Sequence, residues 1–392
     1  MADPIRFDAL RARLAARVDV MLATIERLVT VNSYTDNKAG GAEVAAMLAE
    51  ELAADGLTVR MEASERFAPH LVASTARAVE SAAGAIAIVG HLDTVFPPGT
   101  FEGFRCEGGI ARGPGVLDMK GGLVVAIEAL RALAWLGALD RAAVRFVIVS
   151  DEEVGSPEGQ AILRKELAGA ACALVLEAGR QGDLVITRRK GTGSVKAVAR
   201  GVAAHAGNAH DKGKNAIWAL ARFVDRAQQL TDYARGVTVN VGSFHGGQSK
   251  NTVPDLAEAA VDFRFVNAED QRAMIDALVE AGRAAAATVE GTSVEVKYGA
   301  GRTPLERTEA NAALAAEYGA CARAAGLGDG EAPLLGGGSD ASTTAAMGIA
   351  SIDGLGPRGT GFHTKEELIE IATLAPKAEA IARFVAGRLL PA

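Results

Sequence analysis

The chain has 392 residues, more than one hydrophobic core usually serves, so we expect two domains. Apolar residues make up 49% and charged residues 23%, and a net charge of -7 without a basic stripe argues against a nucleic-acid partner. No apolar run is long enough for a bilayer, and the first eight residues show no secretory signal, so no membrane partner is expected. The three cysteines, Cys106, Cys172 and Cys321, show no paired spacing, which favours reduced thiols and a cytoplasmic protein.

The first half of the chain alternates between helical and strand patterns. Residues 8–55 indicate two helices joined by a polar turn at 31–35. Further on, the pattern predicts strands at 57–62, 71–74, 85–89, 144–150 and 173–176, and helices at 119–136 and 161–168. This alternation is typical of an α/β fold whose mainly parallel sheet carries helices on both faces.

The pattern changes near residue 190 and returns near residue 302. Between these points we expect strands at 195–199, 237–241, 259–265 and 294–298, and helices at 215–229 and 268–287. Two helices among four strands predict a small α+β domain with an antiparallel sheet. The rest predicts helices at 309–325 and after 340, a strand at 350–353, and a last helix starting at Pro376. The expected domains are therefore 1–189 and 302–392, which form one catalytic domain in two parts, and 190–301, which is inserted between them.

Chemically capable residues follow the predicted strands. His91, Glu153 and Glu177 come at strand ends, and Asp118 lies in a glycine-rich turn. Parallel strands place their carboxyl ends at one edge of a sheet, where ligands commonly bind. Imidazole and carboxylate groups suit zinc or a similar divalent ion, and carboxylates that converge need cations to offset their repulsion. If they do not converge, they are ordinary solvated acids, and a lone histidine is more often structural than a ligand.

Five ordered motifs resemble a known family. Residues 90–95 (GHLDTV), 115–122 (GVLDMKGG) and 151–156 (DEEVGS), then Glu177 and the Phe362-His363 pair, are similar to motifs of the two-zinc metallopeptidases. That family includes glutamate carboxypeptidase, aminoacylase and succinyl-diaminopimelate desuccinylase, and residues 336–341 (GGGSDA) look closest to the glutamate carboxypeptidases. The resemblance implies a zinc-peptidase catalytic domain and makes the inserted domain a lid and dimerisation domain.

The resemblance also implies a ligand set for two zinc ions, with cobalt or manganese as possible substitutes. His91 and Glu177 would hold one ion, Glu153 and His363 the other, and Asp118 would bridge both. The peptide bond after Asp118 is commonly cis in this family.

Catalytic roles follow from the same resemblance. Glu152 would be the general base, and Asp93 would accept the second N–H of His91 and fix its tautomer. His205, in the lid, would reach the active site of the partner subunit of a homodimer and stabilise the oxyanion. Each of these residues also has a purely structural interpretation. Glu152 could belong to an acidic loop, Asp93 could form a turn, and His205 could be a surface histidine. His70, His210 and His245 receive no role.

Substrate residues are implied in the lid and in the glycine-rich segment. Arg264 would bind a free substrate carboxylate, Asn251 would assist from a neighbouring loop, and Gly338 would offer a backbone N–H. The alternative for Arg264 is that it is an edge-strand arginine in a surface ion pair. Helix capping by Ser339 or Asp340 explains the glycine-rich segment equally well.

The chain is thus expected to cleave a small peptide or N-acyl amino acid with a free carboxylate, with a C-terminal glutamate first among the candidates. Two alternatives remain. One is a deacetylase or desuccinylase of amino-acid metabolism, which shares the metal motifs. The other is a non-catalytic binding protein that kept the fold.

Overall fold

The computed structural model describes residues 7–389 and divides the chain into two compact units. The second unit is Arg189–Glu306 together with Leu335–Gly338, and the remaining residues form the first unit. The first six residues, part of the stretch in which the sequence shows no signal pattern, lie outside the described range. Each unit is described by itself below.

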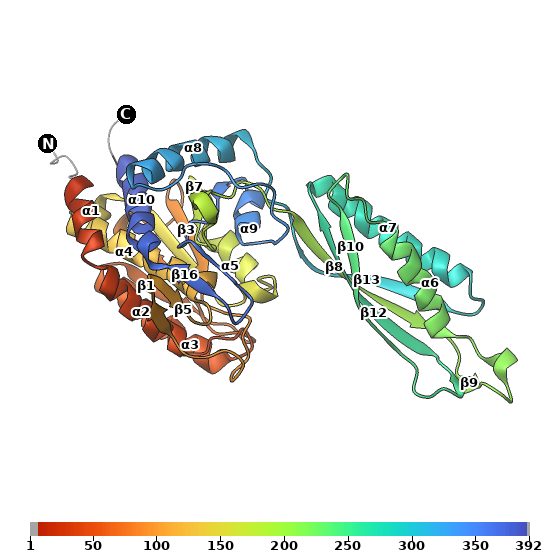
Figure 1. Ribbon diagram of the computed structural model, residues 1–392. Helices are drawn as coiled ribbons and strands as arrows, with labels where there is room; N and C mark the ends of the chain where they lie inside the picture. The colour runs from red at the N-terminus through yellow and green to blue at the C-terminus, as the bar shows by residue number, and fades with distance from the viewer. Residues whose placement is uncertain (1–6, 390–392) are drawn as a thin grey trace. The chain divides into compact units, whose positions relative to one another are not determined.

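A six-stranded sheet forms the centre of the first unit (Figure 1). Its strand order is β1 (Thr58–Glu62), β2 (His70–Ser74), β6 (Val144–Val149), β3 (Ile86–His91), β7 (Cys172–Val175) and β14 (Ala350–Ile352). From β6 to β14 all neighbours are parallel, whereas β2 is antiparallel to both β1 and β6. This sheet confirms the predicted mainly parallel α/β class.

Both faces of this sheet are buried, because alternate residues of one strand face different layers. Ile86 and Ile88 of β3 belong to the main hydrophobic core, whereas Ala87 and Val89 are fully buried on the opposite face. The helices of this unit are α1 (Phe7–Ala15), α2 (Val18–Thr30), α3 (Lys38–Ala54), α4 (Gly121–Trp135), α5 (Gly159–Glu166), α8 (Glu309–Ala324), α9 (Ala341–Ala346) and α10 (Leu374–Gly387).

Two helix predictions were wrong in detail. Residues 8–55 form three helices rather than two, because Arg17 leaves the helical conformation and pairs its guanidinium with Glu128 of α4. The last helix starts at Leu374, so Pro376 lies in its first turn. Proline fits there because first-turn N–H groups have no partner within the helix.

A second, smaller sheet in the first unit is absent from the sequence prediction. It consists of β15 (Gly359–Thr360), β16 (Leu368–Glu370), β5 (Ile110–Arg112) and β4 (Arg105–Glu107), all paired antiparallel. Strands of two or three residues are too short to produce a readable hydrophobic alternation. This sheet brings the segment after His363 beside the segment before Asp118.

The second unit contains a four-stranded antiparallel sheet with both of its helices on one face (Figure 1). The strand order is β10 (Thr238–Gly246), β12 (Leu256–Phe265), β8 (Gly191–Arg200) and β13 (Ser293–Arg302), and the helices are α6 (Ala216–Gln228) and α7 (Ala268–Ala287). A separate two-stranded ribbon pairs β9 (Ala204–His205) with β11 (Thr252–Val253). The unit has a hydrophobic core of its own beneath α6 and α7, which includes Phe223, Phe263 and Leu278.

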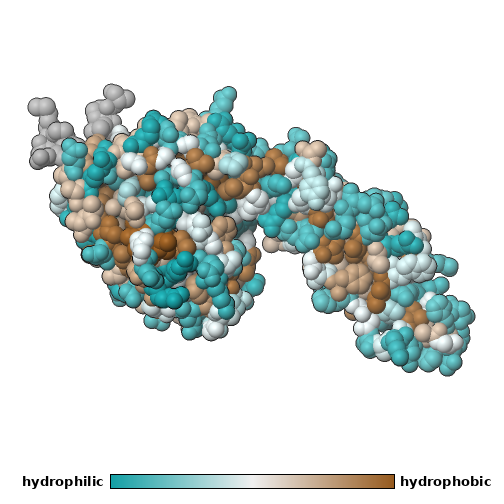
Figure 2. All heavy atoms as spheres, in the orientation of Figure 1, coloured by the Kyte–Doolittle hydropathy of each residue, from teal (hydrophilic) through white to brown (hydrophobic). Residues whose placement is uncertain are grey.

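The surface carries a mixture of hydrophilic and hydrophobic residues on both units, as Figure 2 shows for one face. Within residues 7–389, no helix combines the length and the apolar character that a bilayer crossing requires.

Candidate metal centre

The carboxyl ends of three neighbouring parallel strands supply four of the predicted site residues. His91 is the last residue of β3, Glu152 and Glu153 form a short turn after β6, and Glu177 follows β7 by two residues. Asp118 joins them from the turn that precedes α4, and its peptide bond to Met119 is cis, as the resemblance implied. The edge of the sheet predicted to hold ligands is therefore the edge where these side chains meet.

The five predicted metal ligands form one continuous cluster around Asp118. Its Oδ1 lies 3.2 Å from Nε2 of His91, and its Oδ2 lies 3.3 Å from Nε2 of His363. On the His91 side, Oε1 of Glu177 lies 3.9 Å from Nε2 of His91. On the His363 side, Oε2 of Glu153 lies 3.1 Å from Nε2 of His363. One carboxylate thus faces two imidazoles, each accompanied by a further carboxylate.

The tautomer of His91 shows that this arrangement fits a cation. Its Nδ1 lies 3.0 Å from the backbone carbonyl of Asp93, which can only accept a hydrogen bond, so Nδ1 carries the hydrogen. In the neutral ring, Nε2 then points a lone pair at Asp118, whose carboxylate oxygen also has only lone pairs to offer. A proton or a cation between them removes this repulsion.

The pKa values in the cluster also indicate that it fits a cation. Burial raises the pKa of Glu153 to about 8 and places the pKa of Glu177 well above its ordinary value. Hydrogen bonds with Asp118 and Glu153 raise the pKa of His363 to about 10. Among the described residues, Oε1 of Glu153 is also buried without a hydrogen-bond partner. In the absence of a cation the cluster therefore holds protons, and oxygen and nitrogen donors of this kind suit zinc, cobalt or manganese.

Asp93 lies behind the His91 ring, where both its backbone carbonyl and its carboxylate face Nδ1. The nearer acceptor for Nδ1 of His91 is the Asp93 carbonyl at 3.0 Å, while Oδ1 of the side chain lies at 3.4 Å. The carboxylate also accepts the backbone N–H groups of Glu152 at 3.1 Å and Glu153 at 3.2 Å, and the hydroxyl of Thr35 at 2.8 Å. Asp93 therefore holds the Glu152–Glu153 turn as well as His91.

Glu152 lies next to the cluster, on the side of Glu177. One ligand atom from each of His91, Glu152 and Glu177 lies within 4.8 Å of the other two. Its neighbour Glu153 is grouped instead with His91 and Asp118. Each of the two adjacent acids thus has a carboxylate oxygen within 4.8 Å of a ring nitrogen of His91.

Glu367 is a buried residue of this region that the sequence analysis missed. Its carboxylate accepts the backbone N–H groups of Gly115 at 3.0 Å, Leu117 at 2.8 Å and Asp118 at 2.9 Å. The only sequence signal was an acidic pair, Glu366 and Glu367, shortly after His363. Such a pair is common on solvated loops, and the small sheet that buries Glu367 was not predicted.

In the second unit, the structure brings His205 and Asn251 together. His205 ends β9 and Asn251 directly precedes β11, its partner in the ribbon, and the N–H of Ala206 donates to the Asn251 carbonyl at 2.9 Å. Nδ1 of His205 accepts N–H groups from Gly207 and Asn208, both at 3.1 Å. The neutral ring therefore carries its hydrogen on Nε2, which is available as a donor.

Arg264 and Gly338 both lie near Thr192, at the other end of the sheet. Arg264 lies opposite Thr192 in the β12–β8 register, and a Cβ added to Gly338 would come within 3.2 Å of the Thr192 methyl carbon. Arg264 forms a bidentate ion pair with Asp262 of its own strand, at 2.8 and 2.9 Å. The alternative interpretation of Arg264 as a member of an ion pair thus agrees with the structure. The expected edge strand does not, because β12 lies in the centre of the sheet.

The prediction that Asn251 assists Arg264 from a neighbouring loop does not match this geometry. The strand β12 runs from Leu256, near the ribbon, to Arg264, and eight residues of extended strand span roughly 26 Å. Within a single chain, Asn251 therefore lies beside His205 and far from Arg264.

Ser339 and Asp340 have structural partners in the first unit. The Ser339 hydroxyl donates to Asp353 at 2.7 Å, and Asp340 accepts the hydroxyl of Ser156 at 2.7 Å. The Ser339 hydroxyl also accepts the N–H of Ala341, the first residue of α9, at 3.3 Å, which agrees with helix capping by Ser339, whereas the Asp340 side chain caps no N–H of α9.

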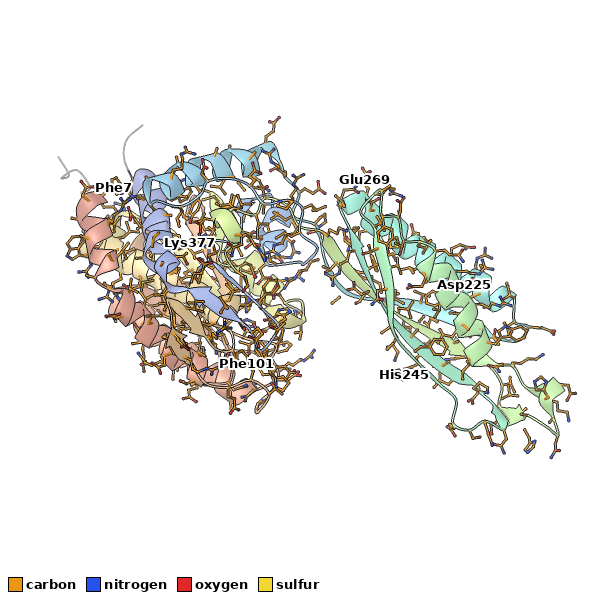
Figure 3. The ribbon with its side chains drawn as sticks, in the orientation of Figure 1. Phe7, Phe101, Asp225, His245, Glu269 and Lys377 are labelled. Carbon is orange, nitrogen blue, oxygen red and sulfur yellow. The ribbon has the colours of Figure 1, made fainter. Side chains whose placement is uncertain are left out.

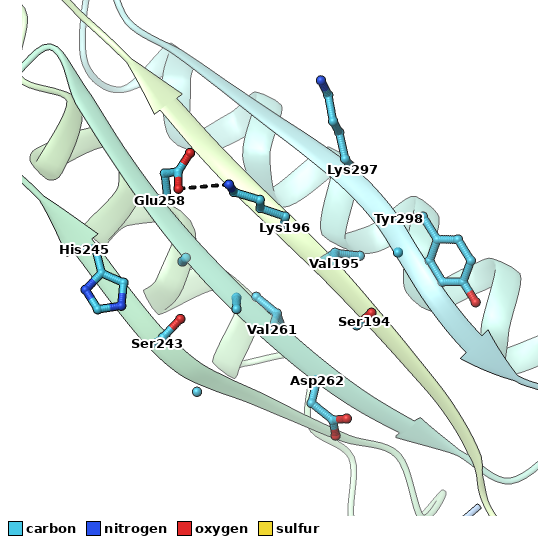
Figure 4. A pocket seen from close by; sticks show the side chains of 14 residues that line it. Ser194, Val195, Lys196, Ser243, His245, Glu258, Val261, Asp262, Lys297 and Tyr298 are labelled. Atoms are coloured by element: carbon cyan, nitrogen blue, oxygen red, sulfur yellow. Dashed lines mark ion pairs between the residues drawn. The ribbon is translucent and has the colours of Figure 1, made fainter. Parts of the chain in front are cut away.

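A hollow of about 630 Å³ lies on the face of the second sheet that α6 and α7 leave uncovered (Figure 4). His245, labelled in Figures 3 and 4, lines it together with the ion pair between Lys196 and Glu258, at 2.9 Å. Its lining contains charges of both signs and none of the predicted site residues.

Comparisons with known proteins give consistent matches along the chain. The profile of Peptidase family M20/M25/M40 matches residues 87–387. Carboxypeptidase G2 of Pseudomonas sp. strain RS-16 is 28% identical over 372 residues, covering 93% of this chain and 88% of that protein. Succinyl-diaminopimelate desuccinylase of Corynebacterium glutamicum is 29% identical over 234 residues, covering 55% of this chain and 59% of that protein. A tripeptidase structure from Staphylococcus aureus superposes with a TM-score of 0.78 at 24% identity, covering 94% of this chain and 99% of that chain.

Proposed function

This chain belongs to peptidase family M20/M25/M40, whose members are hydrolases of amide bonds, and from that premise we propose that it is a two-zinc carboxypeptidase. Its substrate would be a small peptide or N-acyl amino acid with a free carboxylate, with C-terminal glutamate as the leading candidate. The observation that carries the proposal is the position of Asp118 between His91 and His363, with one further carboxylate on each side.

In the proposed centre, His91 and Glu177 would hold one zinc ion, Glu153 and His363 would hold the other, and Asp118 would serve both. Zinc bound there would lower the pKa of a water molecule and polarise the carbonyl group of the substrate. Cobalt or manganese would suit the same donors.

The chain's own residues then carry the proton and position the groups. Glu152 takes a proton from the attacking water as its oxygen bonds to the carbonyl carbon, and gives a proton to the leaving nitrogen as the C–N bond breaks. The products are a carboxylic acid and an amine. Asp93 keeps Glu152 in place through its hydrogen bond to the Glu152 N–H.

His205 supplies the oxyanion donor in this proposal. Its backbone contacts leave the hydrogen on Nε2, which is the form that can donate to a negatively charged oxygen. We propose that it acts in the partner subunit of a homodimer formed through the second unit, which serves as the lid of the catalytic domain.

The substrate carboxylate would be bound by Arg264, with the backbone of Gly338 as a further contact. Asn251, which lies beside His205, would reach the same substrate only from the partner subunit. The planar guanidinium can pair with a carboxylate through two hydrogen bonds. The name of the relative carboxypeptidase G2 supports a carboxypeptidase. The relative named succinyl-diaminopimelate desuccinylase supports the second candidate, an N-acyl amino acid deacetylase or desuccinylase. The three free cysteines fit a cytoplasmic location.

The test is release of amino acids from a panel of peptides and N-acyl amino acids by zinc-loaded protein. Wild type is compared with Glu152→Gln, which keeps the size of the side chain, and with Glu366→Gln, an exposed acid outside the cluster. We expect glutamate-selective release that falls about 10²- to 10⁴-fold in Glu152→Gln and stays unchanged in the control.

Preference for other acyl amino acids would keep the mechanism and move the substrate to the deacylases. Equal activity of Glu152→Gln and wild type would refute the assignment of the base. Absence of metal-dependent turnover on every substrate would overturn the proposed function in favour of a binding protein.

A further inference from the structure

Glu367 lies where two segments that carry predicted metal ligands meet. It directly precedes β16, whose Leu368 pairs with Arg112 at the end of β5. The chain that leaves β5 continues through Gly113 to Gly115 and into the turn that contains Asp118. The β5–β16 pairing therefore fixes Glu367 beside that turn.

The Glu367 carboxylate makes three hydrogen bonds to this turn. Oε2 accepts the N–H of Gly115 at 3.0 Å, while Oε1 accepts those of Leu117 at 2.8 Å and Asp118 at 2.9 Å. Glu367 is fully buried, so water does not compete for these bonds.

Glu367 is also connected to His363 through a short loop. Its N–H donates to the carbonyl of Thr364 at 3.2 Å, and the N–H of Thr364 donates to the carbonyl of Gly361 at 3.0 Å. This loop holds His363 at a φ of 62°, an uncommon backbone conformation for a residue with a side chain. Loop and turn are thus held together by one side chain.

We propose that Glu367 is a positioning residue that sets the separation between the Asp118 carboxylate and the His363 imidazole. The proposal rests on the metal centre of the proposed function. Because Asp118 faces His91 as well as His363, a shift of its turn disturbs both sides of the cluster. Loss of the Glu367 contacts should therefore weaken the binding of both ions, whereas loss of Glu177 should weaken one.

The neighbouring residue offers a matched control. Glu366 has the same side chain one position earlier, but it is 83% exposed and its carboxylate lies 3.5 Å from Nη1 of Arg112. In Glu367→Gln the new amide group cannot accept a hydrogen bond through its nitrogen, so at least one of the three N–H groups loses its acceptor.

The experiment measures zinc dissociation constants and stoichiometry by competition with a chromophoric chelator and by native mass spectrometry. The proteins are wild type, Glu367→Gln, Glu366→Gln and Glu177→Gln. We expect Glu367→Gln to bind both ions about 10- to 100-fold more weakly, Glu366→Gln to match wild type, and Glu177→Gln to lose affinity at one position. Glu367→Asp, which keeps the charge but shortens the side chain, should lie between Glu367→Gln and wild type.

The failures of the two proposals are distinguishable. If wild type binds two ions and Glu367→Gln binds them equally well, the positioning role is overturned and the metal centre stands. If wild type binds no metal, the metal centre itself is overturned, and this inference with it.

Should the Glu367 variants fail to fold, wild type provides the test through amide hydrogen exchange. The N–H groups of Gly115, Leu117 and Asp118 should exchange slowly and at similar rates, because one buried carboxylate holds all three. Fast exchange at these positions would overturn the proposal.

Discussion

At the scale of single residues, Asp93 shows that a backbone atom can perform a role expected of a side chain. The carbonyl oxygen of Asp93 accepts a hydrogen bond from Nδ1–H of His91. The carboxylate accepts the N–H groups of Glu152 and Glu153. One residue thus orients a predicted metal ligand and the turn that carries the predicted base.

Lys377 provides a residue-scale prediction about pH. It lies on α10 (Figure 3), its side chain is 2% exposed, and Nζ is 3.7 Å from Oδ1 of Asp183. Burial lowers its pKa from 10.5 to about 8, although Asp183 acts to raise it. Between pH 8 and 10.5 the unfolded chain binds more protons here than the folded chain, so stability rises with pH, by about 3 kcal/mol in total.

Urea denaturation at pH 8 and at pH 10 measures this contribution. Lys377→Met should show a smaller rise than wild type between the two pH values, because its side chain does not titrate. Asp183 keeps a partner in this variant, since Nη1 of Arg358 lies 2.9 Å from its Oδ2. An equal rise in both proteins would contradict the prediction.

At the scale of elements, the helix α7 has the bounds that the sequence predicted, Ala268–Ala287. Its first turn is satisfied by two side chains. Oδ1 of Asn267 accepts the N–H of Asp270 at 3.0 Å, and Glu306 accepts that of Ala268 at 3.1 Å. Residues of the Asn and Asp type are favoured at this position because their side chains reach back to the free N–H groups.

Asn267→Ala should therefore lower the free energy of unfolding of the second unit by about 1 kcal/mol. Asn267→Asp should retain most of that stability, because aspartate is an equally good cap and adds a favourable negative charge at the helix N-terminus. Chemical denaturation followed by amide exchange of α7 measures both variants. Equal loss in the two variants would show that the cap hydrogen bond is not what stabilises this end.

At the scale of the whole molecule, the predicted site residues fall into three groups. The metal cluster lies in the first unit, while the second unit holds Arg264 with Gly338 at one end of its sheet and His205 with Asn251 at the other. The roughly 26 Å of strand between the last two groups is longer than a small substrate. This separation supports our proposal that His205 serves the active site of a partner subunit.

Subunit complementation tests that proposal. Glu152→Gln and His205→Ala should each be nearly inactive alone. After subunit exchange, a mixed dimer would contain one intact site, with Glu152 from one chain and His205 from the other, so an equal mixture should regain about a quarter of wild-type activity.

The matched control mixes Glu152→Gln with Glu177→Gln. Both positions belong to the same cluster, so every site in the mixed dimer lacks one of them and no activity should return. If the His205→Ala mixture also stays inactive, His205 does not act across a dimer.

The sequence by itself determined the class of fold, the family and the edge of the sheet where the ligands gather. Local information suffices for these features, because a buried strand, its polar end and a glycine-rich turn are each written within a few neighbouring residues. The parallel order of β6, β3 and β7 then brings His91, Glu153 and Glu177 to one edge without further information.

Only the tertiary structure decided the contacts that depend on register between distant segments. Glu367 is 250 residues from Leu117, and a two-residue or three-residue strand gives no periodic signal from which their pairing could be read. The grouping of Asn251 with His205, and the pairing of Arg264 with Asp262, likewise depend on which strand ends lie side by side. The sequence indicates which side chains have suitable chemical groups, whereas the register of the strands determines which of these side chains are in contact.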